Sequence, residues 1–217
     1  MTRAGRRTVA LGSERWVEKR MRKVGKYVGF LLIGLGASVA QAVPVVTTTS
    51  GPTTQVTGVT TVDFTNGCAY TSCVGNFAIV DGDNVSGRYA RPVGSTGNYL
   101  TVPTRDSIGS VLLTLPNPAN YFGLLWGSLD TYNSITFVMT SGPNVTFTGS
   151  DIANRLGLVA DGNQSVPASN AYINFFFGDL LFSAVRLSSN GYAFESDNHA
   201  FGANVPEPGA LALFGIG

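Results

Sequence analysis

The chain has 217 residues, with 14 Lys and Arg against 13 Asp and Glu, but these charges are unevenly placed. Residues 1–42 hold nine of the 14 basic and two of the 13 acidic residues, so residues 43–217 keep five basic and 11 acidic ones, a net charge of −6. A body so poor in basic residues excludes an extended nucleic-acid interface. Its 175 residues, which contain no Lys, suit one domain with a sizeable core.

The N-terminal part has the three-part layout of a secretory signal peptide. An apolar run over residues 27–39 leads into Ala40-Gln41-Ala42, which predicts cleavage before Val43 by signal peptidase after passage through the Sec translocon. The apolar run is too short for a transmembrane helix, which needs about 20 residues. Three basic residues precede the run: Arg22, Lys23 and Lys26.

Residues 1–20 contain no apolar segment and only lengthen the charged region. We therefore expect Met21 to be the true start, with residues 1–20 a mis-called extension; a long native charged region is the alternative. Either reading assigns residues 1–42 to an export signal.

Residues 43–58 are rich in Thr, Pro and Gly and predict an extended arm or a first edge strand. Residues 59–204 show many short stretches with alternating apolar residues, bounded by Gly, Asn, Asp and Pro, which predicts an all-β sandwich or jelly-roll-like domain. The only expected helix is 150–156, capped by Ser150 or Asp151. The expected strands are 59–64, 74–80, 97–102, 110–115, 120–126, 133–140, 144–148, 171–177, 181–187 and 191–196.

Alternation within two of these stretches assigns their faces. In 133–140, Ile135, Phe137 and Met139 share one side, and in 171–177 the residues Ala171, Ile173, Phe175 and Phe177 do so. We expect one face of the sheet to be buried and the other to be partly wet.

Cys68 and Cys73 are the only cysteines. In an exported chain this pair predicts a disulfide that closes a small loop. A metal pair is disfavoured, because there is no second Cys pair and His199 is the only histidine. His199 itself is expected on the surface or on an edge strand. The sequence has no G-x-S-x-G motif to supply a nucleophile for it.

Carboxylates are the remaining candidates for chemistry. Glu195 and Asp197 lie two apart on an expected strand, so they share a face and could form the acid pair of a glycoside hydrolase. A solvated strand end or a structural calcium site is the more ordinary reading, and Asp81 and Asp83 offer calcium ligands of the same kind. The turn-forming sequence 81–84 needs no metal, however.

Three aromatic residues, Tyr121, Trp126 and Tyr132, could form a platform for sugar rings. Strand alternation over 121–126 places Trp126 with Phe122 on one face, which favours a core position for Trp126. A carbohydrate-binding module is therefore an alternative function rather than the first one.

The domain must end before Pro206 and Pro208, because neither residue fits a regular helix or a central strand. An apolar segment begins at Ala210 and stops at Gly217 after eight residues. These eight residues are too few to cross a bilayer. We expect them to be the truncated start of a membrane segment.

The C-terminal residues 205–217 (VPEPGALALFGIG) resemble the opening of the PEP-CTERM sorting signal of Gram-negative surface proteins. In that signal a Val-Pro-Glu-Pro motif precedes a Gly/Ala/Leu-rich membrane helix and an Arg cluster, and an exosortase processes it. The second half of the helix and the Arg cluster do not occur here. Residues 121–137 and 194–198 resemble one group of exosortase-dependent proteins less specifically. The motif residues carried over are Val205, Pro206, Glu207 and Pro208.

The resemblance implies a non-enzymatic envelope, surface or extracellular-matrix protein. Such a protein contacts the inner membrane transiently, and an exosortase is its processing partner. Exopolysaccharide is a further candidate partner in the matrix. No cofactor is expected beyond structural calcium. A secreted carbohydrate-binding module and, more weakly, a glycoside hydrolase remain the alternatives.

Overall fold

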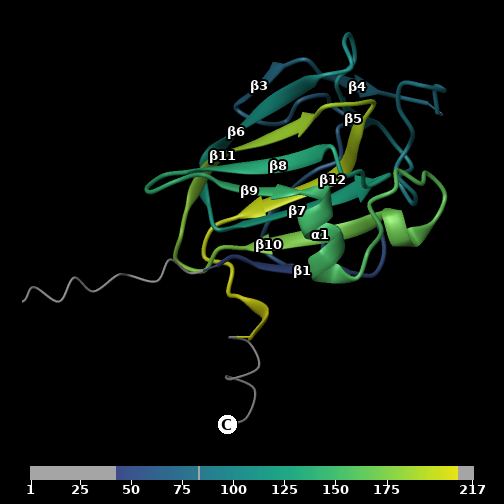
Figure 1. Ribbon diagram of the computed structural model, residues 1–217. Helices are drawn as coiled ribbons and strands as arrows, with labels where there is room; N and C mark the ends of the chain where they lie inside the picture. Colours follow the sequence, from purple (N-terminus) through teal and green to yellow (C-terminus); the bar gives the residue numbers. More distant parts are fainter. Residues whose placement is uncertain (1–42, 83, 210–217) are drawn as a thin grey trace, which may run out of the picture. The chain divides into compact units, whose positions relative to one another are not determined.

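Two antiparallel sheets packed face to face form the body of the protein, which confirms the expected all-β sandwich (Figure 1). The computed structural model describes residues 43–82 and 84–209. The expected cleavage site at Ala40 and Ala42, the residue Asp83 and the apolar segment 210–217 lie outside this described part.

The first sheet follows the order β1, β10, β7, β12, β5, β4, and β2 pairs with the last part of β12. Its central strand β12 therefore has neighbours on both sides, with β7 on one side and β5 and β2 on the other. The strands of this sheet are β1 (Val45–Thr49), β2 (Thr60–Val62), β4 (Ala78–Val80), β5 (Tyr99–Val102), β7 (Tyr121–Gly127), β10 (Ala171–Phe176) and β12 (Phe194–Gly202).

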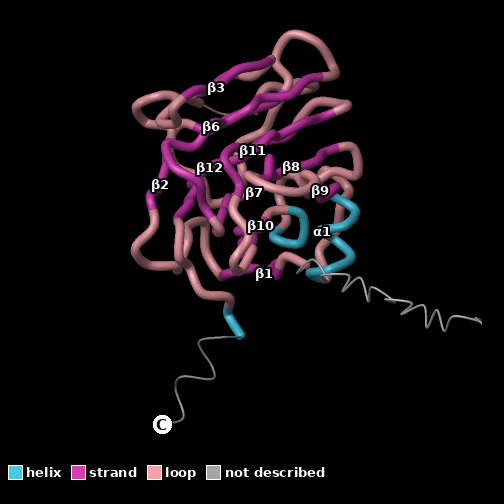
Figure 2. Tube along the Cα trace, turned by 90° about the vertical axis from the view of Figure 1, so that its left-hand side faces the viewer, coloured by secondary structure: helices cyan, strands magenta, loops and turns pink. Residues whose placement is uncertain are grey.

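The second sheet follows the order β3, β6, β11, β8, β9. Figure 2 shows the strands of the two sheets from the side. Its strands are β3 (Ser72–Gly75), β6 (Gly109–Ala119), β8 (Asn133–Met139), β9 (Val145–Thr148) and β11 (Phe182–Ser189).

The single strand expected over 74–80 is wrong, because the chain changes sheets there. Gly75 ends β3 with a φ of 148°, and a Cβ at this position would collide with the carbonyl of Ser110. Only glycine tolerates this combination of conformation and close approach. The chain then continues into β4 of the other sheet.

The inner faces of both sheets are mostly apolar, and Phe137 of β8 packs among other aromatic side chains there. Its ring contacts five other phenylalanines, with ring centroids between 4.6 and 6.4 Å apart. The alternation expected for 133–140 is confirmed, since Ile135, Phe137 and Met139 are buried and the residues between them are partly exposed. Burial of these side chains is the main stabilising contribution to the sandwich.

The helix α1 (Gly149–Leu156) contacts β1 and β9, one edge strand of each sheet (Figure 1). Thr148 caps it, in place of the expected Ser150 or Asp151. The Thr148 hydroxyl accepts a hydrogen bond from the Asp151 amide, and the Asp151 carboxylate accepts one from the Thr148 amide. This reciprocal pair satisfies two backbone donors at the helix start. A short 3-10 turn, η1 (Pro167–Ser169), precedes β10.

The outer face of β10 is buried, so the expectation of a partly wet face is wrong for this strand. Residues 50–59, which we call the strap, cover this side of the first sheet. The Thr54 hydroxyl of the strap lies 2.7 Å from the Tyr121 hydroxyl, and Asn198 donates to the Pro52 carbonyl at 3.0 Å. The alternative of an edge strand in 43–58 is confirmed, because β1 in this region forms the edge of the sheet beside β10.

Candidate functional site

The Val-Pro-Glu-Pro segment follows β12 closely, and its first residue is fixed to the domain. Val205 is only 8% exposed, and its N–H donates to Asn120 Oδ1 at 3.0 Å. The Asn120 Nδ2 group donates to the carbonyls of Val205 and Gly178, at 3.0 and 2.7 Å. One buried amide therefore ties the start of the segment to the turn after β10.

The residues after Val205 lie at the surface. Pro206 and Pro208 are exposed, and neither has an N–H that could join a sheet ladder. The expectation that Pro208 fits no regular helix is wrong, because residues 208 and 209 are helical and the first turn of a helix tolerates a proline. Glu207 is half-buried beside Gly178, where an added Cβ would lie 3.0 Å from Glu207 Oε1. Hollows of about 490 and 710 Å³ flank the segment, and Val205 and Pro206 line both. The segment is thus presented with open space on two sides.

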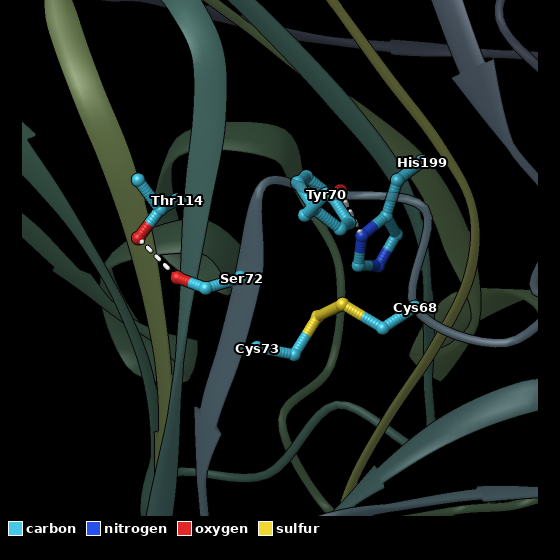
Figure 3. The surroundings of a disulfide bond; sticks show 6 residues. All are labelled: Cys68, Tyr70, Ser72, Cys73, Thr114 and His199. Atoms are coloured by element: carbon cyan, nitrogen blue, oxygen red, sulfur yellow. Dashed lines mark hydrogen bonds between the residues drawn. A yellow bond between two sulfur atoms is a disulfide. The ribbon is translucent and has the colours of Figure 1, made fainter.

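The disulfide between Cys68 and Cys73 is confirmed (Figure 3). The loop that it closes holds Tyr70, whose hydroxyl lies 2.7 Å from His199 Nδ1. The His199 Nε2 atom lies 2.9 Å from the Ser196 hydroxyl. The small loop thus fixes a tyrosine against the buried histidine.

The expected surface or edge position of His199 is wrong: the residue is fully buried on the central strand β12. The pairing of β12 with β7 shifts register between Asp197 and Ala200, and Asn198 has a φ of 49°. This bulge breaks the alternation, so that His199 does not share the outer face of Asp197. Burial lowers the pKa of His199 to about 3, so the imidazole is neutral.

Glu195 and Asp197 share the outer face of β12, as their spacing predicts, but both are buried and the expected solvated strand end is wrong. The Glu195 carboxylate accepts from the Ala90 N–H at 2.8 Å and from the Ser128 hydroxyl at 2.5 Å. Asp197 accepts from the Ser95 hydroxyl at 2.7 Å. These bonds hold the segment 90–95 against the sheet.

Burial raises the pKa of Glu195 to about 8, and the nearby charge of Asp130 adds to this effect. Glu195 lines a polar hollow of about 190 Å³ together with Asp130 and Asp161, whereas Asp197 does not line it. The proposed hydrolase pair therefore does not open into one common space.

The two calcium candidates have different surroundings. Asp81 is exposed just after β4, and Asp83 lies outside the described residues. Glu195 and Asp197 are buried, and their carboxylates accept hydrogen bonds from other residues of the protein. Within residues 43–82 and 84–209, no three His, Cys, Asp or Glu side chains gather in a way that could hold a metal ion.

The expected aromatic platform does not exist as one surface. Trp126 is fully buried and stacks on Phe194 at 4.2 Å, which confirms its expected core position. Tyr121 is also fully buried, on the opposite face beneath the strap. Tyr132 is half-buried and donates to the Tyr192 carbonyl at 2.8 Å.

Sequence reasoning missed Asn120 and Gly178, which hold the C-terminal segment in place. Asn120 contacts Val205 and Gly178, which lie 85 and 58 positions away in the chain, and no local sequence pattern marks such contacts.

Among the described residues, no helix has the length and apolar character needed to cross a membrane. Comparison with known proteins finds no protein family whose model matches the chain and no curated protein that matches it.

Proposed function

We propose that the protein is an exported, non-enzymatic envelope, surface or extracellular-matrix protein of a Gram-negative bacterium, sorted by an exosortase that recognises Pro206-Glu207-Pro208. The observation that carries this proposal is the way the segment is presented: Val205 is fixed by Asn120, and the two prolines after it are exposed. A processing enzyme needs an accessible segment outside the sheet. Residues 205–207 have no regular secondary structure, and the prolines keep the segment out of the sheet.

The disulfide supports the exported location. Structural disulfides persist in oxidising compartments and are rare in the cytosol of mesophiles. The Cys68–Cys73 bridge is therefore consistent with export through the inner membrane and with a final location outside the cytosol.

The test replaces Pro206, Glu207 and Pro208 with Ala in the native host and follows the protein by cell fractionation. The expected result is loss from the surface and extracellular fractions and accumulation in the inner membrane, since the enzyme no longer recognises its signal. A control variant replaces three consecutive exposed residues outside the motif with Ala and should sort normally. These residues are Arg105, Asp106 and Ser107. Unchanged surface display of the first variant would refute the role of the motif.

A further inference from the structure

The larger of the two hollows beside the motif has the chemistry of a binding site. We call it the motif groove; it encloses about 710 Å³, within the range of small-molecule sites. It lies between β1, the strap, β10 and the C-terminal segment. Its lining is Thr47, Thr48, Thr49, Gln55, Val56, Thr57, Gly58, Asn174, Phe176, Ala203, Asn204, Val205, Pro206 and Pro208.

The described lining carries no charged side chain, although residues 43–217 as a whole are acidic. Seven of these residues are Thr, Asn or Gln, whose hydroxyl and amide groups can donate and accept hydrogen bonds. Val56, Phe176 and Val205 supply an apolar part. A lining that is uncharged, rich in hydroxyls and amides, and partly apolar matches an uncharged sugar, which presents hydroxyl groups and C–H faces together.

Two buried polar atoms in this lining lack a partner among the described residues. Asn174 is 1% exposed; its Oδ1 accepts from the Tyr121 hydroxyl at 2.7 Å, whereas its Nδ2 has no partner. The Thr49 hydroxyl is also buried and unpaired. An unpaired buried donor costs about 1–3 kcal/mol, so each such group favours a ligand that can hydrogen-bond to it.

The position of the Asn174 amide is held firmly. Tyr121 donates to Asn174 and lies 2.7 Å from the Thr54 hydroxyl, which in turn accepts from the Val56 N–H at 3.0 Å. The strap, the sheet and the amide thus form one hydrogen-bonded set. A preorganised donor loses little entropy when a ligand binds to it.

We propose that the motif groove binds an uncharged oligosaccharide, with Asn174 and Thr49 as hydrogen-bonding partners. A neutral glycan fits better than an anionic one, because the described lining offers no cation to pair with a carboxylate or sulfate. Binding would attach the sorted protein to polysaccharide. The proposal does not depend on recognition by the exosortase, because binding in the groove needs only the fold of the protein, in which the domain and residues 205, 206 and 208 together form the lining.

The test is saturation-transfer NMR and calorimetry of the purified protein with maltotriose, cellotriose and mannotriose, and with trigalacturonic acid as the anionic comparison. We expect binding of at least one neutral trisaccharide and none of the anionic one. Thr57→Trp would fill the rim of the groove and should abolish binding, whereas Thr53→Trp, at an exposed strap position outside the lining, should retain it.

Four results would overturn the proposal. The first three are the absence of binding by all three neutral sugars, equal binding by Thr57→Trp and wild type, and loss of binding in both tryptophan variants. A synthetic peptide of residues 209–217 is measured in parallel. If it binds in the groove and the sugars do not, the groove is a peptide site and the proposal is also wrong. Because these are measurements in solution, their failure is distinct from a failure of sorting in the cell.

Discussion

Replacing the buried Glu195 with Gln should remove a large pH dependence of stability. In the unfolded chain this carboxyl loses its proton near pH 4.5, whereas in the folded protein burial holds its pKa at about 8. Between these values the folded state binds more protons, so the free energy of unfolding falls as pH rises through this range. Below pH 4.5 both states are protonated and the full contribution is present.

The size of the effect follows from the gap between the two pKa values. A gap from 4.5 to about 8 corresponds to about 5 kcal/mol, because one pH unit is worth about 1.4 kcal/mol. Gln keeps the shape of the protonated side chain and can still accept from the Ala90 N–H and contact the Ser128 hydroxyl. Near pH 5 the variant should therefore match wild type, and near pH 9 it should be more stable by several kcal/mol.

The assay is urea denaturation, followed by circular dichroism, of both proteins between about pH 5 and 9. His199 limits stability on the acid side, since its pKa falls from 6.5 to about 3 on folding and the unfolded chain takes up the proton as pH drops through this range. Both proteins should show this loss of stability at low pH, because both contain His199. If the difference in unfolding free energy between the two proteins stays constant from pH 5 to 9, the loss of stability at high pH does not come from Glu195, and the assignment is refuted.

Three further substitutions test individual contacts, each by urea denaturation against wild type. Replacing Cys68 and Cys73 together with Ser should cost about 2 kcal/mol, because the loop is short, and an equal midpoint under oxidising conditions would contradict this. Gly123→Ala should cost about 1–3 kcal/mol, since its Cβ would lie 2.5 and 2.7 Å from two tyrosine hydroxyls; full stability would show that these rings can move. Asn120→Ala should cost about 1–3 kcal/mol and accelerate hydrogen exchange at the Val205 amide; unchanged exchange there would show that Asn120 does not fix the segment.

The parts of the fold that depend on local pattern could be predicted from sequence. Within the expected range 133–140, β8 (Asn133–Met139) has the expected faces. One face meets the core and the other is partly exposed, so apolar and polar residues alternate along the strand. The pattern fails where a distant segment changes the environment. Both faces of β10 are buried because the strap covers one of them, and the strap lies more than 100 residues earlier in the chain.

Some residues of the candidate site are also marked by a local sequence pattern, and others are not. Pro206, Glu207 and Pro208 could be singled out as a candidate motif because they are contiguous in the sequence. The burial of His199 could not, because one extra residue in the bulge near Asn198 reverses the face of everything after it. Alternation is reliable only while the register of a strand is unbroken.

The coverings of the first sheet explain why polar side chains are buried in an otherwise apolar sandwich. The strap and the segment 90–95 are irregular, so their backbone N–H groups have no ladder to join and need side-chain acceptors instead. Glu195 supplies one such acceptor to Ala90, and Thr54 supplies one to Val56. Loops rather than a second sheet cover this face, and the motif groove lies between the strap and the C-terminal segment, with Asn174 and its unpaired amide nitrogen in the lining.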